Sequence, residues 1–200
     1  MDIQQDHIPI NQYSRPGIRR KTTLAVTWHW VGKPMQTAKM VRDYFASLAK
    51  PYNPQSPIYA SAQFIIGMEG EIIQCTPLDE VAYHAGSSKV DPASGKIYTD
   101  LARKVLGEQY CGLQYTPNHA TIGIELCHKD WSGEFSNKTL DSLVELTAWL
   151  FDEYRPTLAD TKTQIVRHYD LVGHKHCPLW FYDHPDYFAY TKERVRAKLI

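Results

Sequence analysis

The chain has 200 residues, enough for one domain with a substantial core, and its 43% hydrophobic and 22% charged content is typical of globular proteins. Lys plus Arg and Asp plus Glu are equal at 22 each, and this zero net charge argues against a nucleic-acid-binding surface. No apolar run approaches the ~20 residues of a membrane-spanning helix, and the polar N-terminus lacks a secretory signal. We therefore expect cytoplasmic synthesis, no membrane insertion, and four cysteines present as free thiols.

The N-terminal segment and the first apolar run have different characters. Residues 1–22 show no apolar periodicity, so we expect an extended arm that packs on a domain spanning residues 23–200. Leu24–Val31 is apolar and rich in β-formers, which predicts a buried central strand. His29 lies near the C-terminal end of that strand, where sites collect in α/β sheets. The residues alone leave open whether His29 is functional or a satisfied core histidine.

The next segments predict a helix, a hairpin and a turn. Apolar residues at helical spacing predict a helix over Thr37–Leu48. Ser61–Gly67 and Glu71–Cys75 flank a short turn and predict a β-hairpin. His84 lies among small residues and is followed closely by Gly86. This pattern predicts an exposed imidazole at a tight turn, or a turn histidine bonded to the backbone.

A long polar connection, Ser87–Asn118, leads to the second predicted central strand, with a short helix expected over Tyr98–Leu106. The strand is Thr121–Cys127, and its anomaly is Glu125, a carboxylate inside an apolar run. If the strand is buried on both faces, an ionised Glu125 is costly unless it is paired or functional. At a sheet edge, Glu125 would merely face solvent. The functional interpretation is favoured because buried strands read as continuous apolar runs.

The C-terminal third predicts two helices and a short strand. Asn137–Tyr154 has the clearest helical periodicity in the chain, with Ser136 or Asn137 as its cap. Gln164–Arg167 predicts a strand that delivers His168 to a loop, and Tyr187–Leu199 predicts a basic amphipathic helix. The expected fold is therefore α/β, a single domain with a central mixed β-sheet flanked by helices.

The segment Arg167–Pro178 is dense in metal-binding side chains. Its candidate ligands are His168, His174, His176 and Cys177. Zinc binds this mixture of imidazole and thiolate, and a catalytic zinc has three protein ligands and one open position. His29 and His168, each at a strand end, are candidate ligands. The third would come from His174, His176 or Cys177, and the residues alone do not choose between them.

Six short motifs, taken in order, resemble those of the type-2 N-acetylmuramoyl-L-alanine amidases. These are zinc enzymes related to peptidoglycan-recognition proteins and phage endolysins. The motifs are Thr27–Gly32, Gly70–Gln74, Tyr83–Gly86, Ile122–Leu126, Arg167–Asp170 and Lys175–Pro178. Each motif is weak alone, but their order across residues 24–178 is highly specific.

The resemblance implies a set of roles for individual residues. The metal would be Zn²⁺, held by His29, His168 and Cys177. Glu125 would be the general base, and Lys175 would stabilise the oxyanion of the tetrahedral intermediate.

Further residues are expected around that centre. Trp30, His84 and Asp170 are assigned to the substrate-binding groove. Asp170 has two alternative interpretations, as a partner that orients a ligand histidine or simply as a turn residue. Three further histidines are expected at the surface or in loops. They are His119, His128 and His174.

The resemblance implies hydrolysis of the lactyl amide between N-acetylmuramic acid and L-alanine in peptidoglycan, by a monomer. A cysteine as third ligand resembles phage or prophage lysins, so we expect release to the cell wall at lysis. The alternative is a non-catalytic peptidoglycan receptor on the same fold. A third hypothesis, a closed structural zinc site, would require Cys127 or His176 as a fourth ligand.

Overall fold

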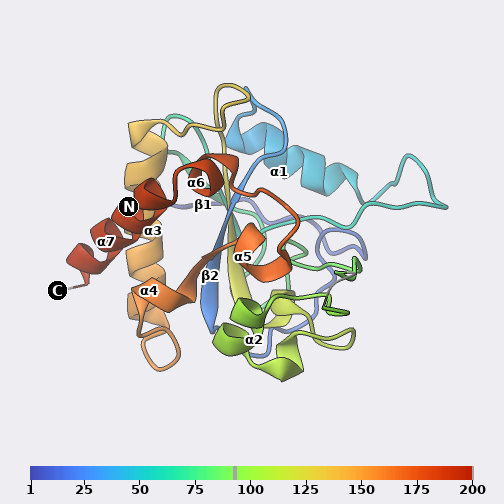
Figure 1. Ribbon diagram of the computed structural model, residues 1–200. Helices are drawn as coiled ribbons and strands as arrows, with labels where there is room; N and C mark the ends of the chain where they lie inside the picture. The colour runs from blue at the N-terminus through green and yellow to red at the C-terminus, as the bar shows by residue number, and fades with distance from the viewer. Residues whose placement is uncertain (92–93, 200) are drawn as a thin grey trace.

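A mixed β-sheet forms the centre of the protein in the computed structural model, which describes residues 1–91 and 94–199 (Figure 1). Within these residues the sheet has six strands in the order β1-β4-β3-β5-β2-β6. The strands are β1 (Gln4–Gln5), β2 (Ala25–Trp30), β3 (Phe64–Ile66), β4 (Ile72–Gln74), β5 (Thr121–Leu126) and β6 (Ile165–Arg167). Only β3 and β4 pair antiparallel, and the other neighbouring strands pair parallel. The expected α/β single domain with a mixed sheet is confirmed.

The helices lie on both sides of this sheet. They are α1 (Ala38–Ser47), α2 (Asp100–Leu106), α3 (Asn137–Glu153), α4 (Thr161–Gln164), α5 (His168–Val172), α6 (Leu179–Asp183) and α7 (Pro185–Lys198), with short 3₁₀ turns η1 (Glu108–Tyr110) and η2 (Pro117–His119). The four predicted helices are present, with ends shifted by at most two residues. Within the described part of the chain, no helix has the length and apolarity needed to cross a membrane.

One face of the sheet packs against α3 and the C-terminal helices α6 and α7. Ile122, Ile124 and Leu126 alternate along β5 and point to this face, where they join the buried side chains of α3. Trp28 of β2 belongs to the same cluster, and its indole N–H donates a hydrogen bond to Thr147 of α3 at 3.2 Å. This large apolar cluster anchors β2 and β5, two interior strands of the sheet, against α3.

The opposite face is covered in two separate places. Helix α1 packs Val41 and Phe45 against Ile65 and Ile73 of the hairpin. Helices α2 and α5 pack elsewhere on this face, in a cluster that includes Ala25 at the start of β2. The C-terminal ends of β2 and β5 are left between these two clusters, and the candidate site lies there.

The N-terminal segment adds to the sheet. Residues of β1 pair with β4, and Arg15 forms an ion pair with Glu80 at 2.8 Å. A two-residue strand carries no periodicity, so the sequence did not indicate it. The expected division between residues 1–22 and 23–200 remains a prediction. Ile200, at the end of the expected domain, and residues 92–93, in the expected polar connection, lie outside the described residues.

The loop expected after β6 contains a helix instead. Helix α5 begins at His168 and is capped by Asp170, whose carboxylate accepts a hydrogen bond from the Arg167 backbone N–H at 2.8 Å. A helix of five residues is too short for periodicity to reveal it. As a result, His168 is held at the start of a helix rather than in a loop.

Candidate active site

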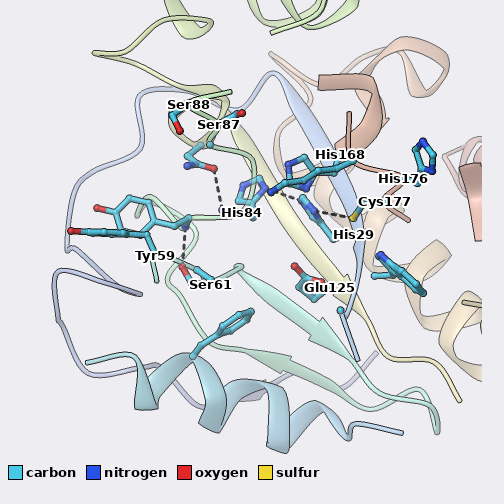
Figure 2. A pocket seen from close by; sticks show the side chains of 18 residues that line it. His29, Tyr59, Ser61, His84, Ser87, Ser88, Glu125, His168, His176 and Cys177 are labelled. Atoms are coloured by element: carbon cyan, nitrogen blue, oxygen red, sulfur yellow. Dashed lines mark hydrogen bonds between the residues drawn. The ribbon is translucent and has the colours of Figure 1, made fainter. Parts of the chain in front are cut away.

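A cavity of about 650 Å³ opens over the C-terminal ends of β2 and β5. Its walls come from β2, β5, α1, α5 and the loops around them (Figure 2). The polar and aromatic residues that line it include His29, Trp30, Tyr59, Ser61, Tyr83, His84, Asn118, Glu125, His168, Lys175, His176 and Cys177. Seven of the eight predicted site residues lie here, and Asp170 is the exception.

Three buried residues in this cavity form a group that could hold a metal ion. They are His29 at the end of β2, His168 at the start of α5, and Cys177, and their candidate ligand atoms all lie within 4.8 Å of one another. His29 Nδ1 faces Cys177 Sγ at 3.8 Å, and the rings of His29 and His168 are 4.8 Å apart between centroids. Figure 2 shows the three side chains converging from separate segments of the chain.

The chemistry of this group fits a bound cation. His168 Nε2 is buried without a hydrogen-bond partner in the described residues. Leaving a buried polar atom unpaired costs about 1–3 kcal/mol, and a bound cation would supply His168 Nε2 with a partner. Two imidazoles and one thiolate are a donor set of catalytic zinc sites. The group therefore has the composition, spacing and unmet bonding capacity of a metal site.

Burial sets the protonation state of these three side chains. It lowers the pKa of His168 to about 3 and that of His29 well below the usual value, so both imidazoles are neutral. Burial also raises the pKa of the Cys177 thiol, with the Glu125 charge acting in the same direction. Neutral imidazoles are ready to bind a metal, whereas the thiol must lose its proton when a metal binds.

Backbone and ion-pair contacts fix His168 and Cys177. The Tyr169 N–H donates to the Cys177 carbonyl at 3.0 Å and ties the C-terminal loop to α5. Asp170 pairs with the Arg167 guanidinium at 2.7 Å, and it does not line the cavity. Of the interpretations open for Asp170, the structure supports a capping role that orients α5 and with it His168.

Glu125 lies beside His29, because the two residues are register partners on the parallel strands β5 and β2. Strand β5 is central, so the alternative of a solvent-facing edge residue is excluded. Burial raises the pKa of Glu125 to about 8, and the positive charge of Lys175 opposes this shift. Lys175 is itself exposed and lies on the wall of the same cavity. A carboxyl group that titrates near neutral pH suits proton transfer.

His84 is buried, with 7% of its surface exposed, so the expectation of an exposed imidazole was wrong. Its Nδ1 lies 3.0 Å from His29 Nε2, on the side of His29 remote from Cys177. The physical reason is Gly123 of β5, whose missing side chain leaves room for the ring: a Cβ there would lie 2.5 Å from the His84 ring. A glycine inside a strand often marks such an approach, and that signal was present in the sequence.

His128 was expected at the surface or in a loop, and it lies in the loop after β5 but is buried. Its ring nitrogens lie 2.7 Å from the carbonyl oxygens of Asp130 and Val31, and its ring stacks on Trp30. These backbone contacts join the loops that follow β2 and β5. Sequence periodicity says nothing about them, because they depend on the register of two distant strands. Trp30 lines the cavity while its indole rests on His128.

His176 and Cys127 lie outside the metal-binding group. His176 is exposed and stacks on Tyr182, with ring centroids 3.9 Å apart. Cys127 is buried in the apolar cluster under α1. Among the described residues the group thus consists of His29, His168 and Cys177 alone. The fourth protein ligand required by the structural-zinc hypothesis is absent from it.

Sequence reasoning missed the aromatic wall at the other end of the cavity. Tyr59 and Tyr83 meet edge to face, with ring centroids 5.8 Å apart, and both line the cavity together with Ser61. Tyr59 and Ser61 are labelled in Figure 2. These residues come from irregular segments without periodicity. Tyr83 opens the motif Tyr83–Gly86, but no sequence signal would have selected Tyr59 as its partner from the 13 tyrosines of the chain.

Comparisons with known proteins find similar sequences and folds over most of the chain. The family model described as N-acetylmuramoyl-L-alanine amidase matches residues 19–180. The N-acetylmuramoyl-L-alanine amidase BlyA of Bacillus subtilis (strain 168) is 30% identical over 194 residues, which are 96% of this chain and 46% of that protein. The chain spans about half the length of the curated relatives it matches.

Solved structures share the fold. The catalytic domain of XlyA is 23% identical with a TM-score of 0.64, covering 98% of this chain and 99% of that one. A mutant endolysin from Bacillus subtilis is 21% identical with a TM-score of 0.63 and the same coverage. These similarities show a common architecture over nearly the whole chain.

Proposed function

The chain belongs to the N-acetylmuramoyl-L-alanine amidase family, and from that premise we propose that it is a zinc-dependent hydrolase of peptidoglycan. The bond cut is the amide between the lactyl group of N-acetylmuramic acid and L-alanine. The observation that carries this proposal is the buried group of His29, His168 and Cys177 beside Glu125 in one open cavity.

The three buried side chains would hold the ion. A zinc ion bound there supplies a Lewis acid that polarises the substrate carbonyl and lowers the pKa of a water molecule to ~7. Asp170 holds α5 and thus His168 in place through its pairing with Arg167. Its carboxylate is engaged by this pairing outside the cavity, so we do not retain it as a substrate contact.

Glu125 acts as the general base. It accepts a proton from the water that attacks the lactyl carbonyl and passes it to the leaving amine of L-alanine. Its position beside His29 places it next to the metal-binding group, and its raised pKa allows both transfers near neutral pH. Lys175 places a positive charge on the cavity wall, where it stabilises the negative oxygen of the tetrahedral intermediate.

The remaining cavity wall binds the substrate. Tyr59 and Tyr83 offer flat, amphipathic surfaces for a sugar or peptide, and Ser61 offers a hydroxyl beside them. Trp30 contributes at the end nearer the metal-binding group. His84 lies behind His29, with 3.0 Å between His84 Nδ1 and His29 Nε2.

We also propose a lytic role, in which the protein accumulates in the cytoplasm and reaches the wall at lysis. Support comes from the similarity of fold to an endolysin. Fractionation of producing cells before and after lysis tests this role, and accumulation outside the membrane in unlysed cells would contradict it. A non-catalytic receptor is disfavoured, because the metal-binding group is complete and Glu125 is present.

Digestion of purified peptidoglycan tests the enzymatic proposal. New amino termini of L-alanine should appear, a chelator should stop their release, and added zinc should restore it. New reducing sugar ends in place of amino termini would show that a glycosidic bond is cut. Wall binding without cleavage in zinc-replete buffer would support the receptor alternative.

A further inference from the structure

A chain of hydrogen bonds runs behind His29, on the side away from Cys177. The Thr121 hydroxyl lies 2.8 Å from the Pro117 carbonyl oxygen and 3.3 Å from His84 Nε2. His84 Nδ1 lies 3.0 Å from His29 Nε2. All three side chains are buried, so water does not compete for these contacts.

The direction of each bond follows from the number of hydrogens available. Thr121 has one hydroxyl hydrogen, and the shorter of its two contacts, at 2.8 Å, assigns it to the Pro117 carbonyl oxygen, which can only accept. The hydroxyl must therefore accept from His84, which places the single ring hydrogen of neutral His84 on Nε2. His84 Nδ1 is then an acceptor, and it takes a hydrogen from His29 Nε2.

The same count of hydrogens fixes the tautomer of His29. A neutral imidazole with its hydrogen on Nε2 has a free lone pair on Nδ1. In this structure Nδ1 is the atom that faces Cys177 within the metal-binding group. The chain of hydrogen bonds thus leaves the lone pair of His29 Nδ1 directed to the position where a cation would bind.

His84 is held in place by more than this chain. The Asn118 carboxamide oxygen accepts hydrogen bonds from the backbone N–H groups of His84 and Ala85, at 3.1 and 2.7 Å. Gly123 leaves the space that the ring occupies. The position of the ring is therefore set independently of the metal, and it can orient His29 before a metal binds.

We propose that Thr121 and His84 are positioning residues that hold His29 as its Nε2–H tautomer and so present Nδ1 to the metal. The role of this arrangement in metal binding rests on the proposed zinc site. The tautomer of His29 does not, because it is a property of the metal-free protein. Partners that orient a ligand histidine typically contribute 10- to 100-fold to metal affinity.

The first experiment is nitrogen-15 histidine NMR on the metal-free protein. We expect His29 and His84 each to carry their hydrogen on Nε2. A hydrogen on Nδ1 of His29 would overturn the proposal. This measurement needs no variant, and it decides the tautomer whether or not the protein binds zinc.

The second experiment compares three variants in competition titrations of zinc against a chromophoric chelator. Thr121→Val removes the acceptor and keeps the shape, and should weaken zinc binding about tenfold or more. Thr121→Ser keeps the hydroxyl and should retain wild-type affinity. Thr27→Val is the matched control, because Thr27 is equally buried on the adjacent strand and its hydroxyl has no partner in the described residues.

The outcomes separate this inference from the proposed function. Equal zinc affinity of T121V and T27V would overturn the positioning role even if the enzyme is a zinc amidase. Failure of the wild-type protein to bind zinc would overturn the metal assignment, and the NMR result would still stand for His29. Wild-type zinc affinity in T121S, together with weakened affinity in T121V, would support the Thr121 hydroxyl as the group that positions His84.

Discussion

Glu125 is the side chain whose chemistry depends most on its position in the sheet. Burial on a central strand beside His29 raises its pKa from an ordinary 4.5 to about 8. A carboxyl group with a raised pKa keeps its proton in the folded state at pH values where the unfolded chain has lost it. Unfolding then releases a proton, so stability falls as pH rises from about 4.5 through about 8.

Glu125→Gln tests this pH dependence in the metal-free protein. The variant lacks the titrating group, so its stability relative to wild type should increase from pH 4.5 upward and level off above pH 8. The gain in the free energy of unfolding should be on the order of 2 kcal/mol. This is less than the full pKa shift implies, because Glu125 keeps some contact with the solvent-open cavity. Urea unfolding at several pH values measures it. A stability difference that is constant with pH would contradict the raised pKa.

A second prediction distinguishes the adjacent residues Cys177 and His176. Cys177→Ala removes a proposed ligand and should reduce zinc affinity by more than the roughly 10–100-fold typical of outer partners. His176→Ala removes a ring that stacks on Tyr182 and should leave zinc affinity unchanged. Titration with a competing chelator measures both. The reverse pattern would assign the metal to His176.

At the scale of single elements, the two faces of β5 have different functions. Ile122, Ile124 and Leu126 pack toward α3 and anchor the strand. Gly123 and Glu125 lie on the other face, where one leaves room for His84 and the other serves the cavity. The alternation of side chains along β5 therefore places core residues on one face and site residues on the other.

Gly123→Ala tests this arrangement. The added Cβ would meet the His84 ring at 2.5–2.8 Å, so the ring must move. We expect a loss of about 1–3 kcal/mol in the free energy of unfolding and weaker zinc binding, since His29 loses its partner. Gly112→Ala is the control, because its Cβ would meet nothing within 4 Å. Unfolding in urea and zinc titration measure the two effects, and equal behaviour of the variants would refute the spatial role of Gly123.

The elements that could be predicted from sequence are those with a long or apolar pattern. The central strands, α1, α3 and the hairpin follow from periodicity. Strand β1 and helix α5 were missed, because two and five residues are too few for a period to show. Their formation depends on a neighbouring strand and on the Asp170 cap, neither of which is visible locally.

Most of the candidate site was predictable because its chemistry resides in unusual residues at strand ends. His29, Glu125 and the cluster after β6 stand out against apolar surroundings, and the structure brings them into one cavity. Gly123 marks a close approach to β5, but the sequence does not show that His84 fills that space or that Thr121 contacts its ring, because both depend on how distant segments pack together.

For the whole molecule, metal binding should be linked to folding. The three proposed ligands come from β2, α5 and the loop after it, so a bound ion joins segments that are far apart in the chain. The unfolded chain does not preserve this arrangement, and binding therefore favours the folded state.

Thermal unfolding measures that linkage. Free zinc at 100 times its dissociation constant should add about 2.7 kcal/mol of stability, which is about 5–10 °C in Tm for a chain of this size. A chelator should reverse the shift, and Cys177→Ala should show a much smaller one. An identical Tm with zinc and with chelator would contradict a zinc site built from these residues.

The central claim is that this protein hydrolyses the lactyl amide of peptidoglycan, and digestion in ¹⁸O-labelled water tests it most directly. Hydrolysis of that amide places one ¹⁸O in the lactyl carboxylate of N-acetylmuramic acid and leaves unlabelled peptides that begin with free L-alanine. Mass spectrometry of the products should find this pattern, and it should disappear with a chelator or with Glu125→Gln. Label on a sugar reducing end, or within the stem peptide, would contradict the account.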